Sequence, residues 1–254
     1  ENVKIVRNAY AIEYDCINPR QLDASLEFKA ISGLFSGGQF NGSSGYEEAA
    51  VQGFMAGVNA ARKLQGKEPV ILDRSQAYIG VLIDDLVTRG TSEPYRMMTS
   101  RSEYRLLLRQ DNADERLVPI GVRVGLNSPE RGEKVRKKYE AVQAEIDRTA
   151  SVGVAPSDKL NGFLAGKNST PLKAGCKLID LLRRPELSYA DLAMFDPERP
   201  ELPAVIREQV EIRVKYAGYI ERRCGHPAAP GDIVWRDGSV VGRHNGALRY
   251  TIGQ

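Results

Sequence analysis

The sequence predicts an α/β amino-terminal part, then a mainly α-helical region, and a short β-hairpin segment at the carboxyl end. Three observations predict this order. A glycine-rich turn joins a short apolar run to a long helical pattern, the segments after it repeat apolar residues at helical spacing, and the last segment places apolar runs around an Asp-Gly turn. We divide the chain into four parts, residues 1–70, 71–150, 151–223 and 224–254.

The first two parts hold the predicted strand and several helices. Ala30–Gly38 is predicted to be a short apolar strand. Tyr46–Leu64 has small or apolar residues at helical spacing, which suits close packing against a sheet. Ser75 can cap a helix that runs to about Val87 and that Gly90 ends.

The third part and the end of the second are predicted to be mainly helical. Arg136–Arg148 carries a narrow apolar stripe of Tyr139, Val142 and Ile146. Ser151–Lys173 is rich in Gly, Ser, Pro and Asn, which predicts a linker or loop. The remaining predicted elements are a short helix at Cys176–Arg183, a cap at Ser188-x-x-Asp191, a helix at Ala204–Arg223, and a hairpin that turns at Asp237-Gly238.

Composition excludes several classes of protein. The 254 residues are 42% hydrophobic and 27% charged, as in folded globular proteins, and the net charge of +3 does not by itself indicate a polyanionic partner. Cys16, Cys176 and Cys224 lack the spacing of a disulfide framework or a zinc site, which suits a reducing cytoplasm. No apolar run is long enough to enter a membrane. Both ends stop inside β-like runs and the first residue is not Met, so we expect that both ends are cut.

The segment Gly37–Ala50 is the most informative for function. A strand that ends in glycines and opens onto a helix presents unpaired backbone N–H groups, so an anionic or electron-rich ligand is expected there. Gly38, Gly42 and Gly45 would let a bulky cofactor approach the backbone, and Gln39 can both donate and accept. A tight turn with nothing bound is the alternative, since the spacing is neither a Walker nor a Rossmann pattern.

Arginines cluster in the second part of the chain, at Arg89, Arg96, Arg101, Arg105, Arg109 and Arg116. If Ser100-x-x-Glu103 caps a helix, Arg101, Arg105 and Arg109 share one face that could follow phosphates. On a strand, Arg105 and Arg109 would still project together. Carboxylates are interleaved with these arginines, so a salt-bridged surface is the alternative.

No metal site is predicted. Asp84-Asp85 and Asp111-x-x-Asp114 have no further ligand nearby, so capping or ion pairing is the expected role. His226 and His244 have no ligand-like spacing. Cys16 is expected to be a small buried thiol rather than a nucleophile. The catalytic residues are unknown, because no position has the pattern of a general base or nucleophile.

Several runs together resemble successive segments of one family. They are Gly38–Ala60, Asp73–Leu86, Glu93–Met97, Thr99–Asp114 and Glu208–Arg222. On these runs, about residues 3–223 resemble the carboxyl-terminal portion of the MnmG (GidA) family, FAD-dependent enzymes that modify the wobble uridine of certain transfer RNAs.

The resemblance implies a fold and a set of site residues. Residues 1–70 would be the remnant of a Rossmann-type FAD-binding domain, in which Gln39, with Gly38, Gly42 and Gly45, contacts FAD. The arginines Arg101, Arg105 and Arg109 would bind transfer-RNA phosphates. The family's dinucleotide fingerprint, redox cysteine motif and nicotinamide-binding stretch are absent from this sequence.

The resemblance also implies a reaction and partners. The intact enzyme, a homodimer, would work with the GTPase MnmE to form an aminomethyl or carboxymethylaminomethyl group at the 5-position of the uridine. Methylenetetrahydrofolate would supply the carbon, FAD would mediate the redox step, and NADH would reduce the flavin. The alternatives are a noncatalytic tRNA-binding or partner-docking fragment and a TrmFO-like folate- and FAD-dependent tRNA methyltransferase.

The last part, residues 224–254, resembles a different family. Gly231–Val234, Asp237-Gly238 and Tyr250–Gln254 are similar to the carboxyl-terminal β-barrel of MnmA, the transfer-RNA 2-thiouridylase. The ATP-binding loop and catalytic cysteines of that family are not present. A natural fusion and a cloning or assembly junction near Arg223-Cys224 both agree with the sequence.

Overall fold

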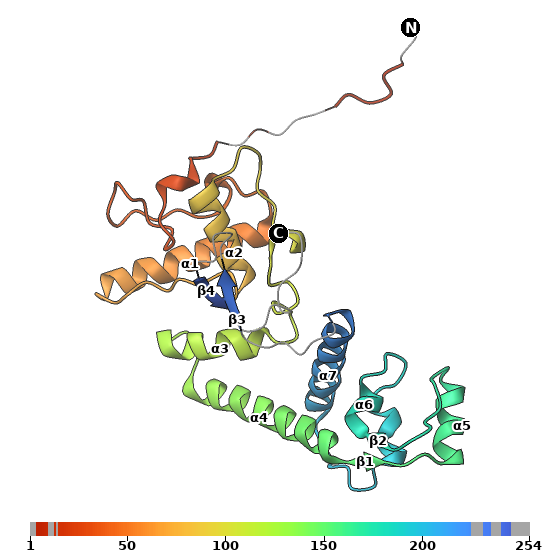
Figure 1. Cartoon of the computed structure of the whole chain (residues 1–254). Helices are drawn as coiled ribbons and strands as arrows, with labels where there is room; N and C mark the ends of the chain where they lie inside the picture. Colours follow the sequence, from red (N-terminus) through yellow and green to blue (C-terminus); the bar gives the residue numbers. More distant parts are fainter. Residues whose placement is uncertain (1–3, 10–12, 14, 225–230, 235–239, 245–254) are drawn as a thin grey trace. The chain divides into compact units, whose positions relative to one another are not determined.

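The computed structural model describes residues 4–9, 13, 15–224, 231–234 and 240–244, with side chains up to residue 217. These residues fall into two compact units (Figure 1). The amino-terminal unit ends at Leu108, and the carboxyl-terminal unit begins at Arg109. The four-part division made from the sequence stays a prediction.

Helix α1 (Tyr46–Leu64) is the largest element of the amino-terminal unit and has the predicted bounds. Its inner face buries Met55 and Ala56 together with the polar residues Gln52 and Asn59. The other elements are short: the 3-10 helices η1 (Pro19–Gln21), η2 (Gly38–Asn41) and η4 (Thr99–Arg101), helix α2 (Tyr78–Asp84), and one π-helical turn, η3 (Asp85–Arg89).

The predicted strand at Ala30–Gly38 is wrong. Residues 22–35 form two isolated antiparallel bridges, Leu22 with Phe28 and Glu27 with Phe35, and the chain turns at Gly33, where φ is 87°. The apolar side chains of Ile31 and Leu34 are exposed, so this segment has no buried face that would favour a strand. The Rossmann remnant therefore stays a prediction for this unit.

The second predicted helix is shorter than expected. Ser75 does not cap it, because the Asp73 carboxylate accepts hydrogen bonds from the Ser75 amide and hydroxyl, and α2 begins only at Tyr78. At Asp85 the helix widens into η3, and Gly90, with φ of 72°, ends it as predicted.

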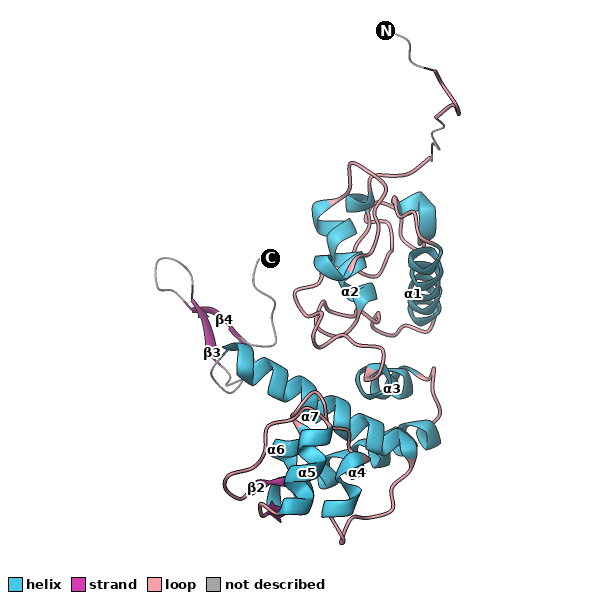
Figure 2. Cartoon of the chain, turned by 90° about the vertical axis from the view of Figure 1, so that its right-hand side faces the viewer, coloured by secondary structure: helices cyan, strands magenta, loops and turns pink. Residues whose placement is uncertain are grey.

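Five helices build the carboxyl-terminal unit, in which helices and loops predominate among the described residues (Figure 2). They are α3 (Ala113–Val124), α4 (Pro129–Ser151), α5 (Asp158–Gly166), α6 (Leu178–Leu182) and α7 (Ala204–Cys224). The strands β1 (Gly153–Val154) and β2 (Cys176–Lys177) pair antiparallel. The prediction of helices at 136–148 and 204–223 is confirmed.

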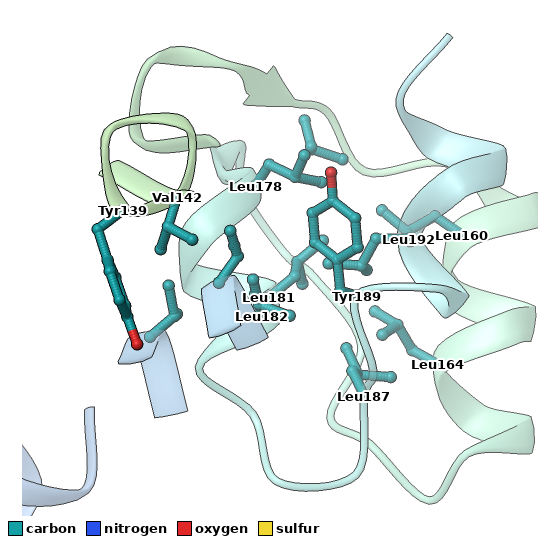
Figure 3. Close-up of a cluster of buried hydrophobic side chains, with 13 residues drawn as sticks. Tyr139, Val142, Leu160, Leu164, Leu178, Leu181, Leu182, Leu187, Tyr189 and Leu192 are labelled. Atoms are coloured by element: carbon teal, nitrogen blue, oxygen red, sulfur yellow. The ribbon is translucent and has the colours of Figure 1, made fainter. Parts of the chain in front are cut away.

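The core of this unit is a cluster of leucines between α4, α5, α6 and α7 (Figure 3). Tyr139 and Val142 of the predicted α4 stripe are buried in it, and Ile146 packs against it. Leu181 and Leu182 of α6 are fully buried. Apolar burial of this kind is the main contribution to the stability of a helical unit.

The prediction of a linker at Ser151–Lys173 is wrong. This segment contains β1 and α5, and Leu160 and Leu164 of α5 lie in the core. The Ser157 hydroxyl accepts a hydrogen bond from the Leu160 amide and so caps α5. The high content of Gly, Ser, Pro and Asn led to the linker prediction, although Leu160 and Leu164 have helical spacing.

The remaining elements agree with the sequence in part. Ser188 and Asp191 cap each other as predicted, with the Asp191 amide 3.1 Å from the Ser188 hydroxyl, but the segment is a 3-10 helix, η5 (Asp191–Phe195). The predicted hairpin is present as β3 (Gly231–Val234) paired antiparallel with β4 (Val240–His244), and its Asp237-Gly238 turn lies outside the described residues. No helix among the described residues is long and apolar enough to cross a membrane.

Candidate functional site

The glycine-rich turn is held on α1 by a chain of buried hydrogen bonds. The Ser36 hydroxyl donates to the Asn41 side-chain oxygen (2.6 Å), and the Asn41 amide donates to Gln52 of α1 (2.9 Å). Gln52 donates to the Ser43 hydroxyl (2.8 Å), which donates to the Gly38 carbonyl (3.1 Å). Asn41 and Gln52 are completely buried, so this network fixes the turn. No motif or spacing in the sequence indicates this network.

The glycines of this turn are required by the packing of the chain itself. Gly38 and Gly42 have φ of 84° and 87°, which side chains rarely adopt. A Cβ atom at Gly45 would collide with the carboxylate of Glu48. The backbone conformation and the packing therefore explain why glycine stands at these positions, without any ligand.

The amino end of α1 has an acidic side chain of the chain itself beside it, and the ligand site expected at this turn stays a prediction. The Glu48 carboxylate is buried next to Gly45, the N-cap residue, and accepts a hydrogen bond from the Met97 amide (2.8 Å). The positive end of the helix dipole therefore already faces a negative charge of the chain. Glu48 thus balances part of the helix dipole within the chain.

Gln39 is exposed at a small hollow, which we call the Gln39 hollow. Its volume is about 180 Å³, and Cys16, Gly42, Ser43 and the segment 91–94 complete its lining. Typical cofactor sites have volumes of about 300–1,000 Å³. The Gln39 amide can meet the edge of a flavin ring here, so the described residues fit one wall of an FAD site rather than a whole one.

The prediction that Cys16 is buried is wrong. Its thiol is exposed and lies in the lining of the Gln39 hollow. The neighbouring Ile17 amide donates to the Phe40 carbonyl (2.9 Å), which holds this segment against the surface of the turn. No apolar segment covers it within the described residues.

The three predicted phosphate-binding arginines do not share a helix or a strand. After η4 the backbone forms turns, in which the Leu107 and Leu108 amides both donate to the Tyr104 carbonyl. Arg101 and Arg105 are exposed residues of the amino-terminal unit, whereas Arg109 belongs to the other unit. Arg109 donates to Asp111 and lies 4.2 Å above the Tyr216 ring, so its guanidinium has structural partners.

Arg74 organises the acidic residues of the amino-terminal unit. Its guanidinium donates to Asp84 (2.9 Å), to Asp85 (2.7 Å) and, through two nitrogens, to both carboxylate oxygens of Glu103. These hydrogen bonds hold the pKa of Glu103 below its usual value. Burial and the hydrogen bond that Tyr95 donates to Asp85 raise the pKa of Tyr95.

The acidic pairs that could suggest a metal are ion-paired, in agreement with the role expected for them. Asp84 and Asp85 bind Arg74, and Asp111 binds Arg109. Asp114 binds Lys138 and accepts a hydrogen bond from Tyr139. Among the side chains that the structure describes, no three potential ligands come together. His226, His244 and Cys224 lie outside those side chains.

Comparison with known proteins shows which family these units resemble. Residues 1–68 match the family described as "Glucose inhibited division protein A", and residues 129–223 match the "tRNA modifying enzyme MnmG/GidA C-terminal helical domain". Both family models describe segments of MnmG/GidA proteins. The resemblance to MnmG is therefore confirmed for the amino-terminal and central parts of the chain, and the resemblance of residues 224–254 to MnmA stays a prediction.

Individual MnmG proteins are similar over most of this chain. It is 63% identical over 223 residues to the "tRNA uridine 5-carboxymethylaminomethyl modification enzyme MnmG" of Caldicellulosiruptor saccharolyticus and to that of Lachnoclostridium phytofermentans. The match covers 88% of the chain but only 36% of each relative. The chain thus spans about a third of the length of these MnmG proteins.

Solved GidA structures have a similar fold. Aquifex aeolicus GidA in its form II crystal matches with a TM-score of 0.71 at 39% identity, over 82% of this chain and 32% of GidA. The form I crystal matches with a TM-score of 0.68 at 35% identity, over 87% of this chain and 36% of GidA. The mostly helical fold agrees with the GidA structures.

Proposed function

We propose that this chain is part of an FAD-dependent enzyme that modifies uridine in transfer RNA. The observation that carries the proposal is the 63% identity over 223 residues to proteins named MnmG. The proposed activity belongs to the whole enzyme, as in these full-length relatives, and not to this chain alone. We further propose the 5-carboxymethylaminomethyl group as the product, together with MnmE as partner, a homodimer as the assembly, a cytoplasmic location, and NADH and methylenetetrahydrofolate as co-substrates.

In this proposal the Gln39 hollow forms one wall of the flavin site. FAD, when bound, supplies the redox chemistry. The Gln39 side chain orients the ring edge by donating and accepting hydrogen bonds, and the turn from Gly38 to Gly45 presents it there. The buried network from Ser36 to Ser43 holds that turn before any ligand arrives.

A noncatalytic tRNA-binding fragment is the second candidate. It is favoured by the small volume of the Gln39 hollow, about 180 Å³, which accommodates only part of a dinucleotide. Measurement of FAD binding by the 254-residue chain separates the two. A flavin absorption spectrum retained through gel filtration supports the enzyme part, and RNA binding without flavin supports the fragment.

Gln39→Ala is expected to weaken FAD binding about fivefold, because one hydrogen bond contributes about 1 kcal/mol. Gln39 is exposed, so the folded chain should be as stable as the wild type. Quenching of flavin fluorescence during titration measures the affinity. Gln65→Ala, at another exposed glutamine of the same unit, is the control and should leave it unchanged. Equal affinity of the Gln39 variant and this control would remove Gln39 from the flavin site.

Arg105→Ala is expected to weaken tRNA binding and to lower the slope of log affinity against log salt by about one. Arg105 is exposed and makes no ion pair with any described residue, so its guanidinium is available to a phosphate. Fluorescence anisotropy with labelled tRNA at several KCl concentrations gives both quantities. Arg131→Ala, at an exposed arginine of α4, serves as control. FAD affinity should stay the same, and normal tRNA binding at every salt concentration would show that Arg105 contacts no phosphate.

A further inference from the structure

A second hollow in the amino-terminal unit adjoins the Gln39 hollow. Its volume is about 640 Å³, and three arginines line it: Arg20, Arg89 and Arg101. We call it the arginine hollow. Thr91, Ser92 and Glu93 line both hollows, so the two adjoin at one short segment.

The 3-10 helix η1 and Gly90 position Arg20 at the arginine hollow. Asn18 caps η1 by accepting a hydrogen bond from the Arg20 amide (3.1 Å), and η1 packs against η3. The Arg20 side chain crosses Gly90, where its Cδ and Cγ atoms lie 3.2 and 3.4 Å from the position that a Cβ atom would occupy. Gly90 has φ of 72°, which also favours glycine. The glycine that ends η3 thus leaves room for the arginine stem.

Arg89 and Arg101 are positioned by the network of Arg74. Asp85 already accepts hydrogen bonds from Arg74 and Tyr95, and its ion pair with Arg89 is long, at 3.5 Å. The Arg89 side chain is therefore 75% exposed. The Arg101 guanidinium carbon lies over the Tyr95 ring, 4.3 Å from its centre, and the Arg101 carbonyl accepts a hydrogen bond from Arg74. Both guanidinium groups keep donors for another molecule.

The charge of the arginine hollow favours an anion. Three arginines line it, and Glu93 is the only acidic residue in its lining among the described residues. Guanidinium groups bind phosphate oxygens with paired, charge-assisted hydrogen bonds. The hollow is also open and too large for one phosphate, which suits several phosphates along a chain.

We infer that Arg20, Arg89 and Arg101 bind the sugar-phosphate backbone of RNA next to the Gln39 hollow. The inference rests on the proposed function and deepens it, since a uridine inside an RNA chain has a phosphate on either side. A uridine that reacts at the wall formed by Gln39 brings those phosphates close to it. The arginine hollow is placed to meet them, because it shares Thr91, Ser92 and Glu93 with the lining of the Gln39 hollow.

The test is tRNA binding by the 254-residue chain with Arg20→Gln and Arg89→Gln combined. Labelled tRNA with an unmodified wobble uridine is titrated over a series of KCl concentrations. Loss of two phosphate contacts is expected to weaken binding about tenfold and to lower the salt slope by about 1.4 to 1.8. The matched control combines Lys67→Gln and Arg131→Gln, which removes two exposed positive charges elsewhere.

Each outcome decides between the proposals. A weaker and less salt-dependent double variant, with an unchanged control, supports the arginine hollow. Equal losses in both double variants overturn it as a site and leave only general charge attraction, while the tRNA proposal stands. A wild-type chain that binds no tRNA contradicts both the hollow and tRNA binding by this part of the enzyme. Should the double variant fold poorly, Arg89→Gln alone repeats the test at a largely exposed side chain.

Discussion

Replacing Arg148 by methionine is expected to destabilise the carboxyl-terminal unit by about 3 to 5 kcal/mol, the cost of leaving buried charges unpaired. Arg148 of α4 donates to Glu145 through two nitrogens, at 2.8 and 2.7 Å, and to both carboxylate oxygens of Asp196. Both carboxylate side chains are only 3% exposed. Without the guanidinium, two negative charges stay buried in the same place.

Hydrogen exchange of peptides from α4, α6 and α7 measures this loss for the carboxyl-terminal unit alone. Arg136→Met is the matched control on the same helix, because Arg136 forms only exposed ion pairs with Glu133 and Glu140. It should change stability by less than about 1 kcal/mol. Adding Glu145→Gln and Asp196→Asn to the Arg148 variant should restore much of the protection. Similar exchange in the Arg148 and Arg136 variants would contradict the role assigned to Arg148.

Arg74→Met is expected to destabilise the amino-terminal unit by about 3 kcal/mol, for the same physical reason. The Asp85 side chain is 4% exposed and would lose its closest positive partner, while Glu103 would lose both of its hydrogen bonds from Arg74. Hydrogen exchange of α1 and α2 peptides measures the effect. Arg62→Met is the control, since the Arg62 guanidinium donates to the Glu68 carbonyl and to no buried carboxylate that the structure describes.

The same substitution should change the acid sensitivity of this unit. In the wild type the pKa of Glu103 is below its usual value, mainly because Arg74 donates to it. A lowered folded-state pKa stabilises the protein above the unfolded pKa, which is about 4.3, and this contribution is lost as the pH falls through the folded value. The Arg74 variant should therefore lose less stability than the wild type when the pH is lowered below about 5. A steeper loss in the variant would contradict this account.

Long helices with regular spacing could be predicted from the sequence, and turns could not. Tyr46–Leu64 forms α1 as predicted because its small and apolar residues repeat along one face. After η4 the chain forms turns, although the spacing of Arg101, Arg105 and Arg109 allowed a helix. Buried Ser102 accepts a hydrogen bond from the Tyr104 amide there, and Arg74 binds Glu103 from 29 residues away. Such contacts between distant residues decide the backbone here, and local spacing does not contain them.

The candidate site, too, could be predicted only where a local motif indicates it, and not where distant segments meet. Gln39 could be predicted as a site residue from its motif, and its role stays a prediction, but its neighbours Cys16 and Thr91 come from separate segments. Arg101 and Arg109 are close in the sequence, yet the structure places them in different units. The role of Arg74 was missed because an ion-pair network is visible only once its three carboxylates, which lie 10, 11 and 29 residues away, are brought together.

The hydrogen bonds of the buried side chains around the glycine-rich turn all run in one direction from donor to acceptor. From Ser36 through Asn41, Gln52 and Ser43 to the Gly38 carbonyl, every group donates to the next one along the series. Rotating either amide by half a turn would set two donors or two acceptors against each other, which is costly without water. The turn therefore has one arrangement, which is selected when the chain folds. A ligand that binds at Gln39 would meet a preorganised surface, so its affinity would not be lowered by the entropy cost of ordering the turn.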